Sequence, residues 1–209
     1  MTDSTPLPPV SPPGHRGPPD HERRQQIIQA AEAHFRHYGF GKTTVADLAR
    51  AIGLSTAYIY KFFDSKRAIG EAVCSLVLSR VLDRARAIAA ESGPAAQRLR
   101  RLFTAMAEIS LEQYFHERRL HDMAVTACTD RWQSVADYDQ RLQAILSTLI
   151  RDGRDSGEFE GRTPLEETSL AITLAMASFL HPLILEERRD QALSDAALLA
   201  GLVLRSLAP

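Results

Sequence analysis

The chain has 209 residues, of which 44% are hydrophobic and 24% are charged, and its formal net charge is −1. These values are typical of a globular protein of one or two domains with a sizeable core. The N-terminus has no apolar run, and the longest apolar stretch, residues 170–185, is interrupted by Thr173, Ser178 and His181. We therefore expect no signal peptide, no membrane partner and a cytoplasmic location.

The first segment, residues 1–19, contains seven of the eleven prolines and few apolar side chains. Such a segment cannot bury enough surface to offset its ordering entropy, so we predict a disordered tail. From Asp20 onward apolar residues recur with helical spacing, which predicts an all-α protein of about nine helices. The first helix has Ile27 and Phe35 on its apolar face, and Gly39 ends it.

Residues 43–66 have the pattern of two short helices joined by a tight turn. Thr44 and Asp47 form a capping box at the start of the first short helix. Gly53 supplies the positive φ that a sharp turn between helices requires. Ser55 is the expected N-cap of the second helix.

The second short helix is predicted over residues 56–62, and either Asp64 or Ser65 caps a third helix that begins at Lys66. Two helices, a glycine turn and a polar second helix predict a helix-turn-helix, whose second helix enters the major groove of DNA. Charge agrees with this interpretation. Residues 20–70 hold eight Lys or Arg against five Asp or Glu, so a basic N-terminal part precedes an acidic remainder.

Further helices follow the helix-turn-helix. Apolar positions predict a long helix over residues 66–90, which the sequence Ser92-Gly93-Pro94 ends. Two more apolar stripes, from Leu99 to Phe115 and from Trp132 to Leu149, predict two helices with a shorter one at 117–128 between them. Residues 152–162 include three glycines and predict a polar loop.

The next predicted helix covers residues 164–187. Thr163 is its expected N-cap, Pro164 its first helical residue and Glu166 the second member of a capping box. This helix is apolar on all sides from Leu170 onward, so it must be covered on more than one side.

The last helix, residues 194–207, is expected to begin at a Ser194 cap, and its leucines alternate with Ala and Gly. Small residues beside leucines allow close helix approach, so we predict that the two C-terminal helices self-associate in a four-helix dimer interface. An alternative is that the pair is buried within one chain. The residues expected at the dimer interface are Leu174, Phe179, Leu198 and Leu202.

The segment from about His21 to Val81 resembles the DNA-binding domain of the TetR family of bacterial one-component regulators. The resemblance implies a DNA-binding domain at 20–81, with its helix-turn-helix at about 44–63, and an effector-binding and dimerisation domain at 82–209. It rests on Phe35-Arg36-His37-Tyr38-Gly39-Phe40, Thr43-Thr44-Val45, Leu48-Ala49, Gly53-Leu54-Ser55, and Tyr60, Phe63 and Ser65-Lys66.

The expected DNA contacts divide into two kinds. The Thr44 hydroxyl and the free amides of its helix form an anion site for a phosphate, and the resemblance implies phosphate contacts for Tyr60 and Lys66. Methyl groups suit thymine, and a lysine donates to guanine O6 and N7. Tyr58 is bulkier than the residue that family members often have there. The expected base-reading set is Thr56, Ala57, Tyr58 and Lys61, with Ser55 beside them.

The resemblance also implies an effector pocket in the C-terminal domain. Its apolar character favours a hydrophobic or amphipathic effector, although each candidate taken alone is more typical of plain core than of a ligand contact. No cofactor or metal is expected, because histidines such as His116 and His121 have no carboxylate or cysteine at ligand spacing and are predicted to be surface residues. The pocket candidates are Phe103, Met106, Met123, Cys128, Trp132, Leu146 and Phe179.

The sequence therefore predicts a homodimeric transcriptional regulator that binds a palindromic operator. The resemblance implies a repressor, and we expect it to be released when a small hydrophobic ligand shifts the helix at 66–90. An enzyme is not expected, because no Gly-rich phosphate loop or G-x-S-x-G motif is present. A redox sensor would need a lowered pKa at Cys74 or Cys128. The main alternative is a helical ligand-binding or scaffolding dimer that lacks salt-sensitive DNA binding.

Overall fold

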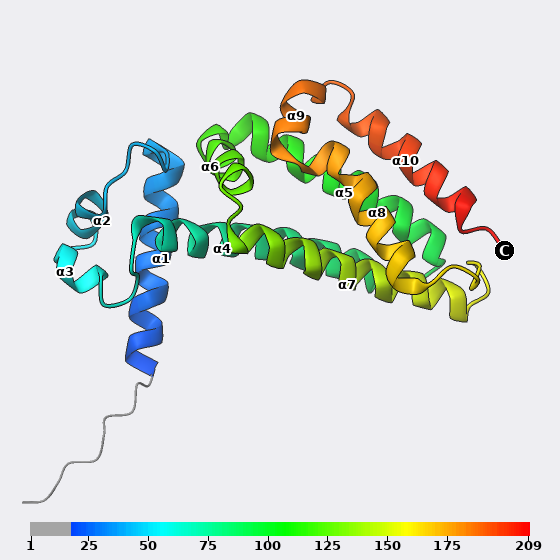
Figure 1. Ribbon diagram of the computed structural model, residues 1–209, viewed down its shortest axis with the longest axis horizontal. Coiled ribbons are helices and arrows are strands. Elements are labelled where there is room, and N and C mark those ends of the chain that lie inside the picture. The colour runs from blue at the N-terminus through cyan, green and yellow to red at the C-terminus, as the bar shows by residue number, and fades with distance from the viewer. Residues whose placement is uncertain (1–17) are drawn as a thin grey trace, which may run out of the picture.

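The computed structural model describes residues 18–209, and these residues form ten α-helices without any strand (Figure 1). The all-α prediction is confirmed. Of the predicted disordered tail, residues 1–17 lie outside the described residues, and Pro18 begins the first helix. The helices are α1 (Pro18–Tyr38), α2 (Val45–Ala51), α3 (Thr56–Ile59), α4 (Lys66–Ala89), α5 (Ala95–His116), α6 (Arg118–Thr129), α7 (Gln133–Asp155), α8 (Leu165–Leu180), α9 (Pro182–Arg188) and α10 (Ala192–Ser206).

The molecule has two parts that α4 connects. The head consists of α1, α2, α3 and the first half of α4, and it lies at one end of the molecule (Figure 1). The body consists of the second half of α4 and α5 to α10. Within the body α4 packs against α7 and α5, and α10 packs against α5 and α8. The head thus presents its short helices away from the bundle.

Two hydrophobic cores stabilise these parts. The body core joins α4, α5, α7, α8, α9 and α10. The head core joins α1 to α4, but it also includes Leu120, Met123 and Ala127 of α6, and Trp132, which follows α6. A Cβ atom added to Gly70 of α4 would lie 2.6 Å from the Phe40 ring and 2.7 Å from the Trp132 ring. The missing side chain of Gly70 therefore allows the start of α7 to approach the head.

The C-terminal helices depart from prediction in three respects. The predicted helix at 164–187 is wrong as a single element, because it breaks at His181 into α8 and α9, bent by 55°. His181 is extended (ψ 122°) because the following Pro182 disfavours a helical backbone before it. This break accounts for the tenth helix.

The predicted caps of the last two long helices are also wrong. Pro164, not Thr163, is the N-cap of α8, and no side chain caps this helix. The Thr163 amide instead donates to the carboxylate of Glu160, at 3.3 Å. The last helix begins at Ala192, and Ser194 lies inside it, where its hydroxyl donates to a backbone carbonyl of the preceding turn.

The segment predicted as a polar loop, residues 152–162, is shorter and better anchored than expected. Helix α7 continues to Asp155, and Phe159 is buried in the body core. A Cβ on Gly153 would lie 2.2 Å from the Phe159 ring, so this glycine makes room for the aromatic side chain. The Glu160 amide donates to the Leu207 carbonyl at 2.8 Å, which ties the loop to the end of α10.

Among residues 18–209 no single helix is long and apolar enough to cross a membrane. By length and composition α8 and α9 together reach that range, but only as a pair bent by 55°.

Candidate DNA-binding surface and ligand cavity

The helix-turn-helix is held by the local interactions that the sequence predicts. The Thr44 hydroxyl accepts a hydrogen bond from the Asp47 amide at 3.1 Å, and the Thr44 amide donates to the Asp47 carboxylate at 2.9 Å. This capping box, with the hydrogen bond from the Thr44 hydroxyl as its largest contribution, lowers the pKa of Asp47. Gly53 has a φ of 65°, and the Ser55 hydroxyl accepts from the Tyr58 amide at 3.1 Å.

The second helix of the motif, α3, is shorter than predicted. It ends at Ile59 rather than residue 62, and the chain continues in tight turns, with the amides of Phe62 and Phe63 donating to the Ile59 carbonyl. Ile59 and Phe63 are buried in the head core. At the next helix Ser65, not Asp64, is the cap.

The eight expected DNA contacts lie on α3 and on the segments that flank it, from the start of α2 to the start of α4. Thr44, Ser55, Ala57, Tyr60 and Lys61 are exposed, whereas Thr56, Tyr58 and Lys66 are half-buried. The Lys61 ammonium lies 5.4 Å from the centroid of the Tyr58 ring. The hydroxyl, phenol and ammonium groups of this set therefore belong to α3 and the segments on either side of it.

Lys66 is positioned by the head itself. Its ammonium donates to the Gly41 carbonyl at 3.3 Å and lies 4.5 Å from the centroid of the Phe40 ring. Partial burial lowers the pKa of Lys66. These contacts hold the charge beside the turn that precedes α2.

Sequence reasoning did not identify the residue that fixes this turn. The Thr43 side chain is buried, donates to the Gly39 carbonyl at 2.8 Å, and lies 3.2 Å from Nδ1 of His34. Two exposed cations beside the turn, Lys42 and Arg50, were counted in the basic charge of the head but not assigned as contacts.

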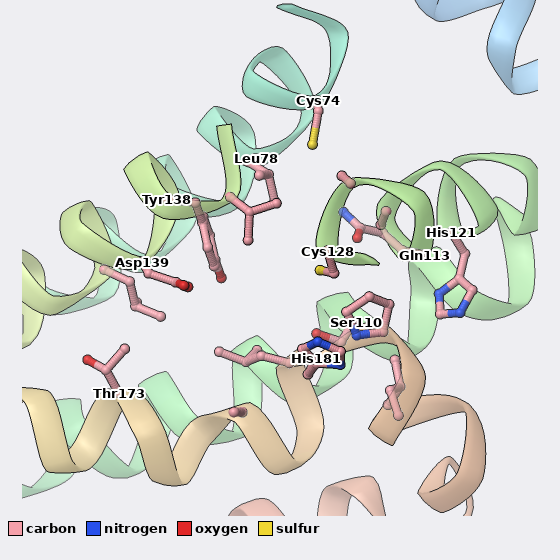
Figure 2. Close-up of a pocket in the computed structure, with 18 residues that line it drawn as sticks. Cys74, Leu78, Ser110, Gln113, His121, Cys128, Tyr138, Asp139, Thr173 and His181 are labelled. Atoms are coloured by element: carbon pink, nitrogen blue, oxygen red, sulfur yellow. The ribbon is translucent and has the colours of Figure 1, made fainter. Parts of the chain in front are cut away.

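A second feature is a cavity of about 170 Å³ inside the body, lined by residues of α4 to α9 (Figure 2). Its apolar wall includes Leu78, Val135, Leu142, Leu180 and Leu185. Its polar wall is made by Ser110, Gln113, His121, Tyr138, Thr173 and His181.

Of the seven predicted pocket residues, only Cys128 lines this cavity. Phe103, Met106, Leu146 and Phe179 are fully buried in the body core, where the Phe103 and Phe179 ring centroids are 5.8 Å apart. Met123 and Trp132 belong to the head core. The apolar residues predicted to line a pocket are therefore packed in the two hydrophobic cores and, except for Cys128, do not line the cavity.

The polar residues of the cavity were missed, and His121 was wrongly expected at the surface. Its side chain is only 5% exposed, and burial, with a smaller effect of Arg118, lowers its pKa. Its ring lies edge-on against Tyr114, with centroids 4.9 Å apart. Sequence offered little signal, because the burial of His121 depends on how α6 packs against other helices.

The two cysteines also line the cavity. Burial raises the pKa of the Cys74 thiol, and it raises the pKa of Cys128 to about 11. Both thiols are therefore protonated at neutral pH, which disfavours the redox-sensor alternative.

An exposed apolar surface lies on α8 and α10, which pack against each other. Leu174 is 66% exposed, Leu198 is 72% exposed and Leu202 is 56% exposed, and Leu170 is also exposed. We name these four leucines the α8/α10 face. Phe179, the fourth residue expected at the dimer interface, is fully buried in its own chain and does not belong to this surface.

The fold and the exposed helix-turn-helix define a helical DNA-binding regulator. Comparisons with known proteins specify its class. Residues 27–73 match the family described as bacterial regulatory proteins, tetR family, and residues 95–198 match the tetracyclin repressor-like C-terminal domain. The HTH-type transcriptional regulator BetI of Cronobacter sakazakii is 30% identical over 155 residues, which are 71% of this chain and 71% of that protein. The chain belongs to the TetR family and is a DNA-binding transcriptional regulator.

Solved structures agree with this fold. A TetR-family transcriptional regulator from Pectobacterium atrosepticum has a TM-score of 0.72 and 18% identity, covering 90% of this chain and 95% of that one. The repressor FadR of Thermus thermophilus, in complex with lauroyl-CoA, has a TM-score of 0.68 and 21% identity, covering 90% and 96%. At these identities the similarity is one of fold.

Proposed function

We propose that this regulator is a homodimeric repressor that leaves a two-fold symmetric operator when a small molecule binds in the body cavity. The observation that carries the proposal is the position of α6. His121, Ala124 and Cys128 of α6 line the cavity, whereas Leu120 and Met123 of the same helix pack in the head core. A ligand that displaces α6 therefore acts on the head directly.

Both ends of α6 are tied to the head, which supports this coupling. At the start, Glu117 forms an ion pair with Arg36 of α1. At the end, the Asp130 carbonyl accepts a hydrogen bond from Arg67 of α4 at 3.3 Å. The Trp132 ring packs edge-on against Phe40, with centroids 5.1 Å apart. Movement of α4, which also lines the cavity, remains part of the proposed mechanism.

In this mechanism the ligand selects between two arrangements of the heads. Two recognition helices in a dimer fit two major-groove half-sites only at one separation. A ligand shifts this equilibrium only if it binds one arrangement more tightly than the other. We propose that the ligand-bound arrangement has the wrong separation, so the operator is released.

The α8/α10 face supports the dimer. Four exposed leucines on two adjacent helices form an apolar surface of the kind that marks interaction sites. Their exposure disfavours the alternative in which the helix pair is buried within one chain. A two-fold dimer would present two heads to DNA, which requires an operator of matching symmetry.

We further propose that the chain acts in the cytoplasm and has no enzymatic activity. The membership of the chain in a family of DNA-binding regulators supports both points. FadR of Thermus thermophilus, which shares the fold, was solved with a bound acyl-CoA, so a body of this shape can hold a small molecule.

Salt dependence of DNA binding tests the proposal. Sequencing the genomic fragments that the protein retains gives an operator, and its affinity is then measured over a range of salt concentrations. Log K should fall as log salt rises, with a slope of about −0.9 per neutralised phosphate. Lys66→Ala should weaken binding to operator and random DNA about equally and flatten the slope by about one unit.

Lys61, compared with Lys66, distinguishes base contacts from phosphate contacts. Lys61→Ala should cost about 1–3 kcal/mol on the operator and less on random DNA, because a base contact contributes to specificity. Equal losses on both would place Lys61 among the backbone contacts. Binding that is independent of salt, or no binding to duplex DNA at low salt, would support the scaffolding alternative.

A further inference from the structure

Two imidazole nitrogens in the cavity wall lack hydrogen-bond partners. Across the part of the chain that the structure describes, six buried side-chain nitrogen or oxygen atoms have no partner, and only His121 Nε2 and His181 Nδ1 belong to cavity-lining residues. Nearly all buried polar groups in proteins are paired, so such exceptions call for a physical explanation. In Figure 2 the two histidines come from different helices, His121 from α6 and His181 from the junction of α8 and α9.

The cavity is large enough to hold a small molecule that provides the missing hydrogen-bond partner. Its volume of about 170 Å³ is far above the ~10–15 Å³ that one water needs. The hydroxyls of Ser110 and Thr173 already donate to backbone carbonyls of their own helices, at 2.9 Å each. Of the two unpartnered histidines, His121 is buried at 5% exposure, whereas His181 is only half-buried. His121 is therefore the histidine whose missing hydrogen bond a ligand would best complete.

We propose that the cavity binds a small uncharged molecule with a hydroxyl group, which hydrogen-bonds to His121, and an apolar body that packs against Leu78, Leu142 and Leu185. The inference deepens the proposed function and rests on it, because it assumes that this cavity is the effector site.

The charges around the cavity favour an uncharged ligand. The lining residues include no Lys or Arg among those described, so an anion would find no charged partner. Asp139 is the only acidic lining residue, and although its position on α7 is exposed, desolvation of its carboxyl raises its pKa and so disfavours the charged form that a cation would need. His121 itself is kept neutral by burial. A charge at the buried end would be desolvated without compensation.

A hydroxyl suits this histidine better than other neutral groups. A neutral imidazole has one donor nitrogen and one acceptor nitrogen, and its tautomer decides which role Nε2 takes. A hydroxyl both donates and accepts, so it can pair with either tautomer. A carbonyl or ether can only accept. Tyr138, whose hydroxyl points into the cavity in Figure 2, has its pKa raised by burial and offers a second neutral partner.

Four probes of similar size test the ligand class directly. They are 3-phenylpropanol, the 3-phenylpropylammonium ion, 3-phenylpropanoate and propylbenzene, each titrated into the full chain by calorimetry. We expect the alcohol to bind about tenfold more tightly than propylbenzene, because one hydrogen bond to a buried group distinguishes them. Both ions should bind more weakly than the alcohol.

Variants identify the anchoring residue. His121→Phe keeps an aromatic ring but removes Nε2, so the affinity for the alcohol should fall to that for propylbenzene. His121→Gln, which restores a polar nitrogen at similar reach, should recover part of the preference. His116→Phe is the matched control, since His116 is exposed and does not line the cavity. His121→Phe should fold, because it removes an unpaired buried nitrogen; circular dichroism checks this.

Several results would overturn the proposal. They are tighter binding of either ion than of the alcohol, an alcohol preference that survives in folded His121→Phe, and failure of all four probes to bind. Operator binding is measured in the same samples. Alcohol binding without operator release would uphold the ligand class and refute the effector role. Absence of probe binding with intact operator binding would refute the ligand class alone.

Discussion

Glu32 is a buried carboxylate that ties α1 to α4. Glu32 is 7% exposed. Its carboxylate accepts hydrogen bonds from Arg36 of α1 and Arg80 of α4, at 2.9 Å each. The hydrogen bond from Arg80 is the main reason why the pKa of Glu32 lies below its ordinary value. Arg36 also pairs with Glu117, so the group connects α1, α4 and the α5–α6 junction.

Replacing this carboxylate should destabilise the protein in a pH-dependent way. Glu32→Gln is expected to lower the free energy of unfolding by about 1–3 kcal/mol at neutral pH, since it weakens hydrogen bonds to charged groups. Because the folded pKa is below the unfolded one, the contribution of Glu32 is complete above the unfolded pKa and is lost as pH falls through the folded pKa. Urea denaturation should therefore show variant and wild type converging in acid.

An exposed carboxylate provides the control for this prediction. Asp83 pairs with Arg86 on the surface of α4, and surface pairs contribute little. Asp83→Asn should therefore leave the urea midpoint nearly unchanged at every pH. A Glu32→Gln variant as stable as wild type at neutral pH would show that burial of this carboxylate offsets its two hydrogen bonds.

Among individual residues, the interactions that the sequence predicts are those between residues close together in the chain. The capping box of Thr44 and Asp47 is confirmed because its members are three residues apart. The role of Glu32 could not be predicted, because Arg80 is distant in sequence and meets it only when α1 packs on α4. His121 was missed for the same reason, since its burial comes from the packing of α6 in the fold.

Among the helices, α6 is held by contacts to both the head and the body. Besides its contacts with the head core, its first residue, Arg118, forms an ion pair with Glu186 of α9, at 2.5 Å. The residue before it, Glu117, pairs with Arg36 in the head. The start of α6 is therefore held by one ion pair to the head and by another to the body.

These two ion pairs give a matched test of coupling. Glu117→Gln should leave ligand affinity unchanged but raise the ligand concentration needed for half-release of the operator, because the tie from α6 to the head is weakened. Glu186→Gln removes the tie to α9 and should not reduce coupling. Operator release is followed by fluorescence anisotropy, with ligand binding measured separately. Equal release curves for wild type and Glu117→Gln would rule out this tie as a coupling contact.

The element boundaries show where local sequence signals suffice. The start of α4 at Lys66 and the glycine turn at Gly53 are predicted because each depends on adjacent residues. The break at His181 was missed although Pro182 was visible, because the continuous apolar pattern around it favoured one helix. In the fold the break lets α9 turn by 55° and close one side of the cavity.

At the scale of the whole molecule, the cavity was the least predictable feature. Large apolar residues such as Phe103 and Leu146 were the natural candidates, but such residues fill the core completely. The cavity lies where smaller and polar residues of six helices come together. Their arrangement depends on how these helices pack, so no local sequence pattern predicts it. The apolar surface of the last helices was predictable because their composition leaves too few polar positions to cover both sides.

The α8/α10 face leads to a prediction for the assembly. A two-fold interface is self-complementary, so one charge introduced at its centre faces its own copy or apolar surface. Leu202→Glu should therefore yield monomers, measured by light scattering. The side chain is 56% exposed within one chain, so the substitution should not disturb the folded protomer. The monomers should bind a half-site weakly and lose the preference for one half-site spacing.

The heads of these monomers should stay folded only in the full chain. The head core includes Leu120, Met123 and Trp132, so residues 21–81 alone would lack part of it. Phe115→Glu is the control, because Phe115 is 60% exposed on α5 and is not one of the residues of the α8/α10 face. It should remain dimeric with wild-type operator spacing. If Leu202→Glu stays dimeric with an unchanged circular dichroism spectrum, the interface does not depend on the α8/α10 face, and the half-site spacing must be set by another pair of helices.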